Sequence, residues 1–156
     1  MIRPATPSDV PTIRRFILEL AEYEKARHEA VATDEDLRRT LFGDAATTHC
    51  VICEGEDGPI GFAVYFFNYS TWQGRRGLYL EDLYVTPSAR GRGAGKGLLR
   101  HLARIAVDND CGRFEWSVLD WNRPAIEFYE AMGATPQSEW IKYRLDGEAL
   151  MRLAQG

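Results

Sequence analysis

A glycine-rich turn between an apolar strand and a helix constrains this chain more than any other feature. From Leu83 to Gly97 the segment reads LYVTPSARGRGAGKG. Glycines at 91, 93 and 95 remove side chains where a backbone must approach a ligand closely. The N–H groups of such a turn converge at the start of the following helix, where the helix dipole also favours an anion. The turn therefore predicts a binding site for a diphosphate.

The charge distribution indicates what kind of anion binds there. Arg90, Arg92 and Lys96 form the one basic cluster, although the chain as a whole carries 19 Lys and Arg against 23 Asp and Glu, a net charge of −4. An acidic protein is poorly suited to bind phosphate backbones in general. A local basic cluster in an acidic chain favours a small anionic ligand, and we expect no nucleic-acid partner.

Known phosphate-binding patterns narrow the interpretation of this turn. A Walker A loop needs Ser or Thr after its lysine, but Gly97 follows Lys96. The dinucleotide fingerprint G-x-G-x-x-G fails because Gly91 and Gly93 lead to Lys96. The pattern that fits is Arg90-x-x-Gly93-x-Gly95 after a strand, which resembles the coenzyme A pyrophosphate loop of the GNAT acetyltransferase superfamily. The alternative is a flexible turn that only caps a helix.

The length and composition indicate the class of protein. A chain of 156 residues, 45% of them hydrophobic, is typical of one globular domain spanning residues 1–156. No apolar run approaches the roughly 20 residues that cross a bilayer. The start Met1-Ile2-Arg3-Pro4 lacks the pattern of a secretory signal. We expect a cytoplasmic protein that does not bind membranes.

The cysteines and histidines predict neither a redox pair nor a metal site. Three cysteines are an odd number for a disulfide framework. Cys50 and Cys53 lie three apart in a predicted strand and so face opposite sides. The three histidines lack metal-ligand spacing, and we expect no metal.

The order of predicted elements indicates an α/β fold. Apolar periodicity, caps and turns predict strands at 2–5, 50–54, 60–68, 78–85, 114–119 and 140–145. Helices are predicted at about 10–25, 33–43, 95–109, 122–132 and 148–153. A hairpin meander followed by strand–helix–strand units predicts a mixed, mostly antiparallel central sheet flanked by helices.

The resemblance to the GNAT superfamily extends over nearly the whole chain. It is strongest toward the diamine (spermidine/spermine) acetyltransferases and their thialysine acetyltransferase relatives. The matching stretches include ELAEYE from Glu19, YSTWQGR from Tyr69, YLEDLYV from Tyr79 and VLDWN from Val118. The resemblance implies a sheet splayed at the coenzyme site, acetyl-CoA as the coenzyme and a homodimer.

The resemblance also implies which residues bind the coenzyme. The backbones of Leu83, Tyr84 and Val85 would pair with the pantetheine arm as an added strand does. Asn122 could bond the same arm, cap its own helix, or do both. The residues expected to cradle the diphosphate are Arg90, Gly91, Arg92, Gly93, Ala94, Gly95 and Lys96.

Acetyl transfer to an amine needs a base and an acid. An alkylamine has a pKa of about 10.4 and arrives protonated, so a base must remove its proton. Glu81 is the candidate base, acting through water, because Glu and Asp are depleted in strands. Glu81 and its neighbour Asp82 could serve one pocket only if a bulge or a second subunit re-aims one of them. By the resemblance, Tyr129 is the candidate acid that protonates the leaving thiolate and is also expected to contact the coenzyme; the alternative is a tyrosine that only packs beside Phe128.

The candidate substrate pocket is acidic. Glu24, Glu81 and Asp82 would select a cationic amine, with Tyr23 beside them. Trp72 would line the aliphatic chain of the substrate. The sequence thus predicts transfer of acetyl from acetyl-CoA to a primary amine of thialysine, a lysine- or ornithine-like amine, or a polyamine. Acetylation of a protein lysine or N-terminus, and a non-catalytic acyl-CoA sensor, are the alternatives.

Overall fold

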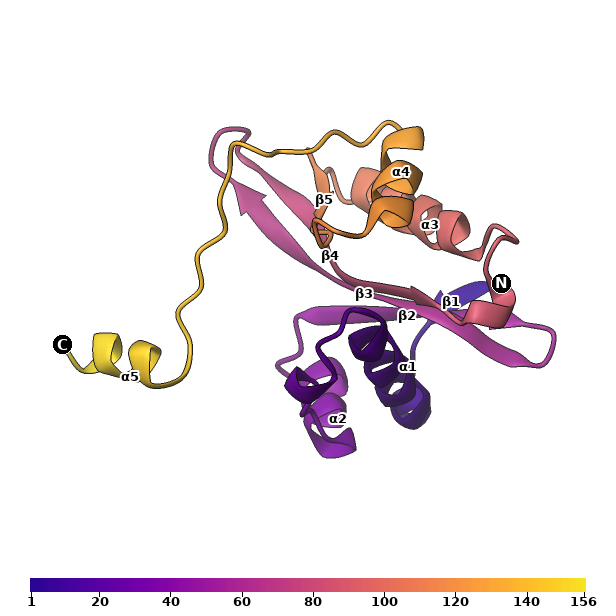
Figure 1. Ribbon diagram of the computed structural model, residues 1–156, viewed down its shortest axis with the longest axis horizontal. Coiled ribbons are helices and arrows are strands. Elements are labelled where there is room, and N and C mark those ends of the chain that lie inside the picture. Colours follow the sequence, from indigo (N-terminus) through magenta and orange to yellow (C-terminus); the bar gives the residue numbers. More distant parts are fainter. The chain divides into compact units, whose positions relative to one another are not determined.

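The computed structural model describes residues 1–156, and they divide into two compact units. The first unit is Met1–Leu119 and the second is Asp120–Gly156. The first contains the whole sheet with three helices, and the second contains two helices (Figure 1).

A five-stranded sheet forms the first unit. Its strands are β1 (Ile2–Pro4), β2 (Thr48–Gly55), β3 (Gly58–Ser70), β4 (Arg75–Val85) and β5 (Phe114–Trp116). They lie in the order β1-β2-β3-β4-β5, and each successive pair is antiparallel except the parallel pair β4 and β5. This arrangement confirms the mixed, mostly antiparallel sheet that the sequence predicts.

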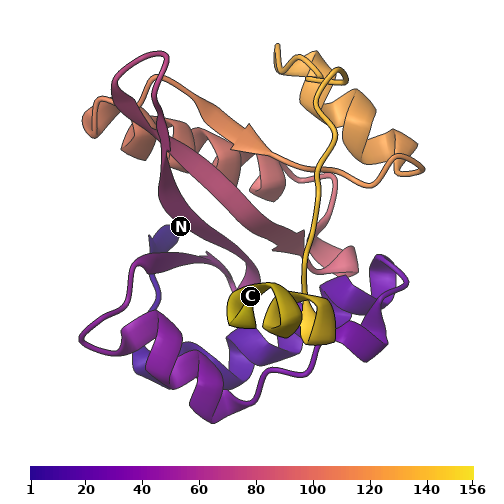
Figure 2. The same cartoon turned by 90° about the vertical axis from the view of Figure 1, so that its left-hand side faces the viewer.

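Helices cover both faces of this sheet. α1 (Val10–Tyr23) and α2 (Asp34–Phe42) lie on one face, and α3 (Ala94–Asp108) lies on the other (Figure 1 and Figure 2). Thr33 and Asp36 form the capping box expected at the start of α2. Short 3₁₀ turns occur at Pro7–Asp9, Arg27–Glu29 and Pro87–Ala89.

The core between α1 and the sheet is aromatic. Phe16 of α1 is fully buried, and its ring centroid lies 5.5 Å from that of Phe62 and 5.8 Å from that of Tyr84. On the other face, Leu98 and Leu102 of α3 are fully buried. Burial of each such side chain contributes about 1.5–3 kcal/mol to stability. This packing holds the end of β4, at Tyr84, against α1.

The sheet opens on the outer side of β4. β5 pairs only with Leu78–Leu80, so residues 81–85 have no strand partner on that side. The predicted splay is therefore present, and it accounts for a strand at Phe114–Trp116 that is shorter than the predicted 114–119. The register between β3 and β4 also shifts here: Val64 lies opposite Asp82 and Tyr65 opposite Leu80, so Glu81 is a bulged residue.

The second unit contains α4 (Arg123–Ala131) and α5 (Gly147–Gln155), which confirm the last two predicted helices. The predicted strand at 140–145 is wrong, because these residues are extended but belong to no strand. Alternating apolar and polar side chains are typical of a strand, but a segment becomes a strand only when its backbone hydrogen-bonds to a neighbouring backbone. The three cysteines are free, in line with the sequence prediction.

Arg3 ties three segments of the first unit together, which predicts a pH dependence of stability. Its Nη1 lies 2.8 Å from Asp9 Oδ2, and its Nη2 lies 2.6 Å from Glu54 Oε1. The Arg3 hydrogen bond, with help from the Thr6 backbone, lowers the pKa of Asp9 from 3.8 to about 2. Because the folded-state pKa is depressed, the stabilisation is complete above about pH 4 and disappears as the pH falls through 2.

We expect Arg3→Met to remove about 2 kcal/mol of unfolding free energy at pH 7 and much less at pH 2. Urea unfolding between pH 2 and 6 measures this difference, with Arg14→Met, an exposed surface arginine, as the control. A loss in Arg3→Met that is equal at both pH values would contradict the assigned role of the ion pair.

Candidate active site

The glycine-rich turn forms an open cradle at the start of α3. Gly91 and Gly93 have φ values of 78° and 85°, in the left-handed region that favours glycine. A Cβ built on either residue meets no atom within 4 Å, so the space beside the backbone is empty. A bound group can approach the main chain there without meeting a side chain.

The first turn of α3 supplies hydrogen-bond donors to this cradle. The Gly97 N–H bonds the Gly93 carbonyl at 2.8 Å, which closes the first turn of the helix. The N–H groups of Ala94, Gly95 and Lys96 precede that bond and have no intrahelical acceptor. No side chain caps the helix at Gly93. Phosphate oxygens are suitable acceptors for these donors, so the residues present fit the diphosphate of coenzyme A.

Arg90 is held at the junction of β4 and the turn. Its Nε donates to the Val85 carbonyl at 2.9 Å. Its guanidinium carbon lies 5.3 Å from the ring centroid of Tyr23 and 5.5 Å from that of Tyr84. These contacts bring Tyr23, expected at the substrate, beside Arg90, expected at the coenzyme.

The backbone of Leu83–Val85 lies on the open side of β4. No strand pairs with these residues on that side. Tyr84 is 5% exposed and packs on Phe16. The Thr86 N–H bonds the Ile60 carbonyl of β3, so the alternation of an antiparallel pair directs the Tyr84 main chain toward β3 as well. The open side is left with the main-chain groups of Leu83 and Val85, of which the Val85 carbonyl already accepts the Arg90 hydrogen bond.

Three predicted acidic residues are electrostatically coupled. Burial, followed by the charges of Glu81 and Glu24, raises the pKa of Asp82 from 3.8 to about 6. Burial also raises the pKa of Glu24. Glu24 follows the last turn of α1, and Asp82 follows the bulged Glu81 in β4, so the fold brings Glu24 and Asp82, 58 positions apart in sequence, to one acidic cluster. A bulge at this position is one of the two ways in which the adjacent side chains of Glu81 and Asp82 could face the same pocket.

Trp72 is not part of this cluster within the chain. It lies in the turn between β3 and β4 and is 81% exposed. Glu81 lies six residue steps along β4 from Arg75, a span of roughly 20 Å at 3.3 Å per residue. Within one chain, Trp72 therefore lies too far along the hairpin from Glu81 for both side chains to contact one small substrate.

The second unit contains the other two candidate residues. Asn122 caps α4, since its Oδ1 accepts a hydrogen bond from Ala125 N at 3.4 Å. Capping was one of its two expected roles. Tyr129 is half-buried on α4, with its ring centroid 5.7 Å from that of Phe128.

A large groove adjoins the glycine-rich turn. It has a volume of about 1380 Å³ and is lined by the end of α1, the turn between β2 and β3, and the turn from Thr86 to Ala94. The β2–β3 turn is a contribution that the sequence argument missed. A hairpin turn carries no signal of what it faces, so only the tertiary structure could reveal it.

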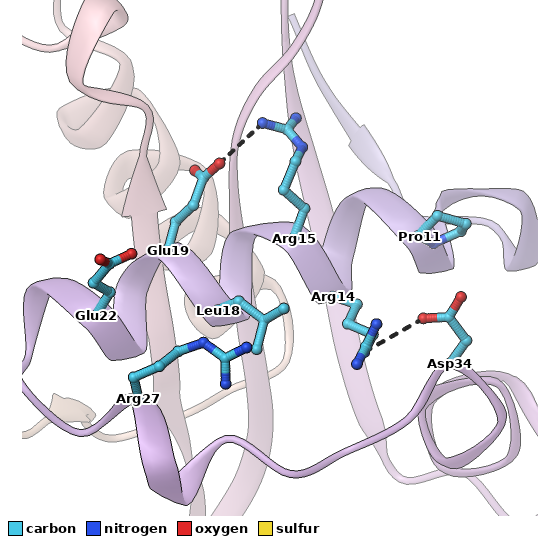
Figure 3. Close-up of a pocket in the computed structure, with 8 residues that line it drawn as sticks. All are labelled: Pro11, Arg14, Arg15, Leu18, Glu19, Glu22, Arg27 and Asp34. Atoms are coloured by element: carbon cyan, nitrogen blue, oxygen red, sulfur yellow. Dashed lines mark hydrogen bonds and ion pairs between the residues drawn. The ribbon is translucent and has the colours of Figure 1, made fainter.

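A smaller cavity of about 280 Å³ lies on the outer side of α1. Figure 3 shows charged side chains around it that pair with one another: Arg15 with Glu19 at 3.2 Å and Arg14 with Asp34 at 3.8 Å. Exposed ion pairs of this kind contribute about 0–1 kcal/mol. They leave little net charge for a ligand, so we assign no site here.

Comparisons with known proteins agree with this geometry. The model of the Acetyltransferase (GNAT) family matches residues 15–134. The thialysine N-epsilon-acetyltransferase of Bos taurus is 42% identical over 165 residues, covering 99% of this chain and 96% of that protein. The L-ornithine N5-acetyltransferase of Arabidopsis thaliana is 34% identical, covering 97% of this chain and 86% of that protein.

The fold has a solved counterpart. An integron cassette protein from the mobile metagenome of V. cholerae superposes with a TM-score of 0.84 at 28% identity, covering 100% of this chain and 98% of that one. The agreement includes the α/β architecture as a whole. By its family match and its relatives, this chain is an N-acetyltransferase that belongs to the Acetyltransferase (GNAT) family.

Proposed function

We propose that this protein transfers an acetyl group from acetyl-CoA to a primary amine of a small cationic substrate. The observation that carries the proposal is the acidic cluster of Glu24, Glu81 and Asp82. Three carboxylates that couple through space favour a ligand with positive charge. The open cradle at Gly91 and Gly93 supports coenzyme A as the donor.

Glu81 and Tyr129 are the proposed base and acid. When bound, acetyl-CoA supplies a thioester, an activated acetyl group. Glu81 accepts the proton of the substrate ammonium through water, and the amine nitrogen then forms a C–N bond to the acetyl carbon as the C–S bond breaks. The Tyr129 hydroxyl gives its proton to the departing thiolate, and the second proton that the nitrogen loses as it becomes an amide restores the Tyr129 phenol. The main-chain groups of Leu83 and Val85 are the proposed partners of the amide groups of the coenzyme.

The substrates we propose are thialysine, lysine- or ornithine-like amines, and polyamines. Relatives are named for thialysine, for L-ornithine and, in a human protein 37% identical to this chain, for spermidine/spermine. The turn at Gly55–Pro59 and the stretch Thr135–Glu139 are shorter than in the polyamine enzymes that the sequence resembles. A homodimer remains a prediction of the resemblance, and a cytoplasmic location remains a prediction of the sequence pattern. The structure has no helix that is both long and apolar enough to span a bilayer.

A panel of amines tests this function. Release of coenzyme A from acetyl-CoA is measured with thialysine, lysine, ornithine, putrescine, spermidine, an unstructured lysine peptide and no acceptor. We expect turnover with at least one diamine or diamino acid and none without acceptor. Turnover with the peptide alone would favour a protein acetyltransferase. Tight acetyl-CoA binding without turnover on any amine would favour the sensor.

Replacement of Asp82 by asparagine tests the acidic cluster. The variant loses one of the three charges that face the distal cation of the substrate. We therefore expect KM for a diamine to rise at least tenfold, with a smaller rise for an amine that has a neutral tail. Asp108→Asn, which removes an exposed charge on α3, is the matched control. Equal effects on both substrates would show that Asp82 does not sense the distal charge.

Asp82→Asn is expected to weaken substrate binding but to increase the stability of the fold. Because the folded-state pKa of Asp82 is raised to about 6, its ionisation costs stability as the pH rises from about 4 through 6. Asparagine removes that cost. Asp82→Asn is thus expected to be more stable than the parent by about 2 kcal/mol at pH 8, and the gain should vanish at pH 4. Thermal unfolding at the two pH values measures the difference.

A further inference from the structure

One face of the β3–β4 hairpin carries two aromatic rings beside the acidic cluster. Phe66 of β3 lies opposite Tyr79 of β4, and their ring centroids are 5.3 Å apart. The next cross-strand pair on the same face is Val64 and Asp82. Two residues of β3 separate the two pairs, a distance of about 7 Å. Since Asp82 belongs to the acidic cluster, the two rings and the cluster are adjacent on one surface.

This surface is the face of the sheet that α1 covers. Val64 is 7% exposed and belongs to the buried core that contains Phe16 of α1. Phe66 and Tyr79 come next along the strands and are only half-buried. The two rings therefore present a partly open apolar surface at the border of that core, on the side toward the acidic cluster.

The Tyr79 ring is fixed by a hydrogen bond. Its hydroxyl oxygen lies 2.9 Å from Oγ of Ser117, the residue that follows β5. The bond ties the ring to a second segment of the sheet, and contact with Phe66 fixes it from the other strand. A ring that is already held in place loses little conformational freedom when a ligand binds.

The proposed substrates share a carbon chain that separates two nitrogen atoms. The acidic cluster attracts a charged nitrogen, but the methylene groups of the chain gain only from contact with an apolar surface. Aromatic faces suit this chain because they also attract an ammonium group. The sequence assigned the chain to Trp72, which lies too far from Glu81 within one chain.

We propose that Phe66 and Tyr79 form an aromatic shelf that binds the carbon chain of the amine substrate, while Glu24 and Asp82 hold a charged nitrogen. This inference rests on the proposed function and adds a preference for longer chains to it. Each methylene group that leaves water for the shelf is expected to tighten binding roughly two- to fourfold.

A series of straight-chain diamines tests the shelf. Calorimetric titration without acetyl-CoA gives Kd for the diamines from 1,3-diaminopropane to 1,6-diaminohexane. For the wild-type protein, we expect Kd to fall roughly two- to fourfold with each added methylene. Phe66→Ala should abolish most of this dependence on chain length and leave the shortest diamine little affected. Phe66→Thr, which keeps a residue with high strand propensity, should give the same result and serves if the alanine variant does not fold.

Phe67→Ala is the matched control. Phe67 is the next residue of β3, is also half-buried and points to the opposite face, where its ring contacts the Arg76 guanidinium at 4.4 Å. This variant removes a ring of the same size, so it should lose stability but keep the dependence of Kd on chain length. Thermal unfolding checks that each variant is folded at the temperature of the titration.

The shelf is overturned if the wild-type protein binds no diamine, if its Kd does not depend on chain length, or if folded Phe66→Ala keeps the same dependence. Equal loss of the dependence in Phe67→Ala would also overturn it. Turnover is assayed separately. Diamine binding with the expected dependence but no acetyl transfer would contradict the proposed function and leave the shelf in place. Turnover of diamines with a dependence that Phe66→Ala does not change would keep the function and overturn the shelf.

Discussion

Replacement of Tyr129 by phenylalanine is expected to lower kcat by about 10²–10⁴-fold, equivalent to roughly 3–5 kcal/mol of transition-state stabilisation. The substitution keeps the ring, and with it the packing beside Phe128, and removes only the hydroxyl. Stability and affinity for acetyl-CoA should therefore change little. Steady-state kinetics, thermal unfolding and calorimetric titration of acetyl-CoA measure the three quantities.

The leaving group offers an internal check on this role. An acyl donor with a more acidic thiol needs less help from a proton donor, so it should recover part of the lost rate in Tyr129→Phe. Tyr143→Phe, in which the lost hydroxyl belongs to a residue that is 91% exposed, is the matched control and should keep full activity. A Tyr129→Phe enzyme with most of its kcat would show that the thiolate leaves unassisted. Joint loss of stability and coenzyme binding would make Tyr129 a packing residue.

Replacement of Gly93 by valine is expected to weaken acetyl-CoA binding at least tenfold, or about 1.4 kcal/mol. A side chain at this position would project into the empty space beside the turn, where a phosphate must approach the backbone. The left-handed φ of 85° adds strain, because a β-branched residue disfavours that conformation. Both effects act on the same cradle, and calorimetric titration measures the loss.

Strain alone must be separated from the steric effect on the ligand. Gly74→Val is the matched control: Gly74 has a φ of 63°, lies in the β3–β4 turn and has open space around it. This variant should lose similar stability but bind acetyl-CoA as the parent does. If Gly93→Val folds and binds with unchanged affinity, the turn does not hold the diphosphate.

Local features of the sequence were sufficient for most of the secondary structure. The helices at Val10–Tyr23 and Ala94–Asp108 follow from apolar periodicity and from glycine at the start of the second. The hairpin of β2 and β3 follows from its Gly-rich turn. These signals involve residues close in sequence, so no knowledge of distant contacts is needed to read them.

The segment at 140–145 shows that local sequence patterns do not predict strand pairing. Its alternation is real, and it correctly indicates which side chains share a face. Pairing, however, depends on a second backbone at hydrogen-bonding distance, and nothing in the hexapeptide specifies that neighbour. The same limit explains why β5 ends at Trp116: its length is set by where β4 diverges from it.

By itself the sequence determined the glycine-rich turn between a strand and a helix, the succession of elements and the acidic residues at 24, 81 and 82, since each is a local pattern of residue types. Only the tertiary structure decided how these residues act together. A one-residue register shift places Glu81 in a bulge, and the burial of Asp82 beside Glu81 and Glu24 raises its pKa to about 6. The physical reason is that burial and Coulomb interactions depend on distance in space, and residues 58 positions apart come together only when α1 packs on the sheet.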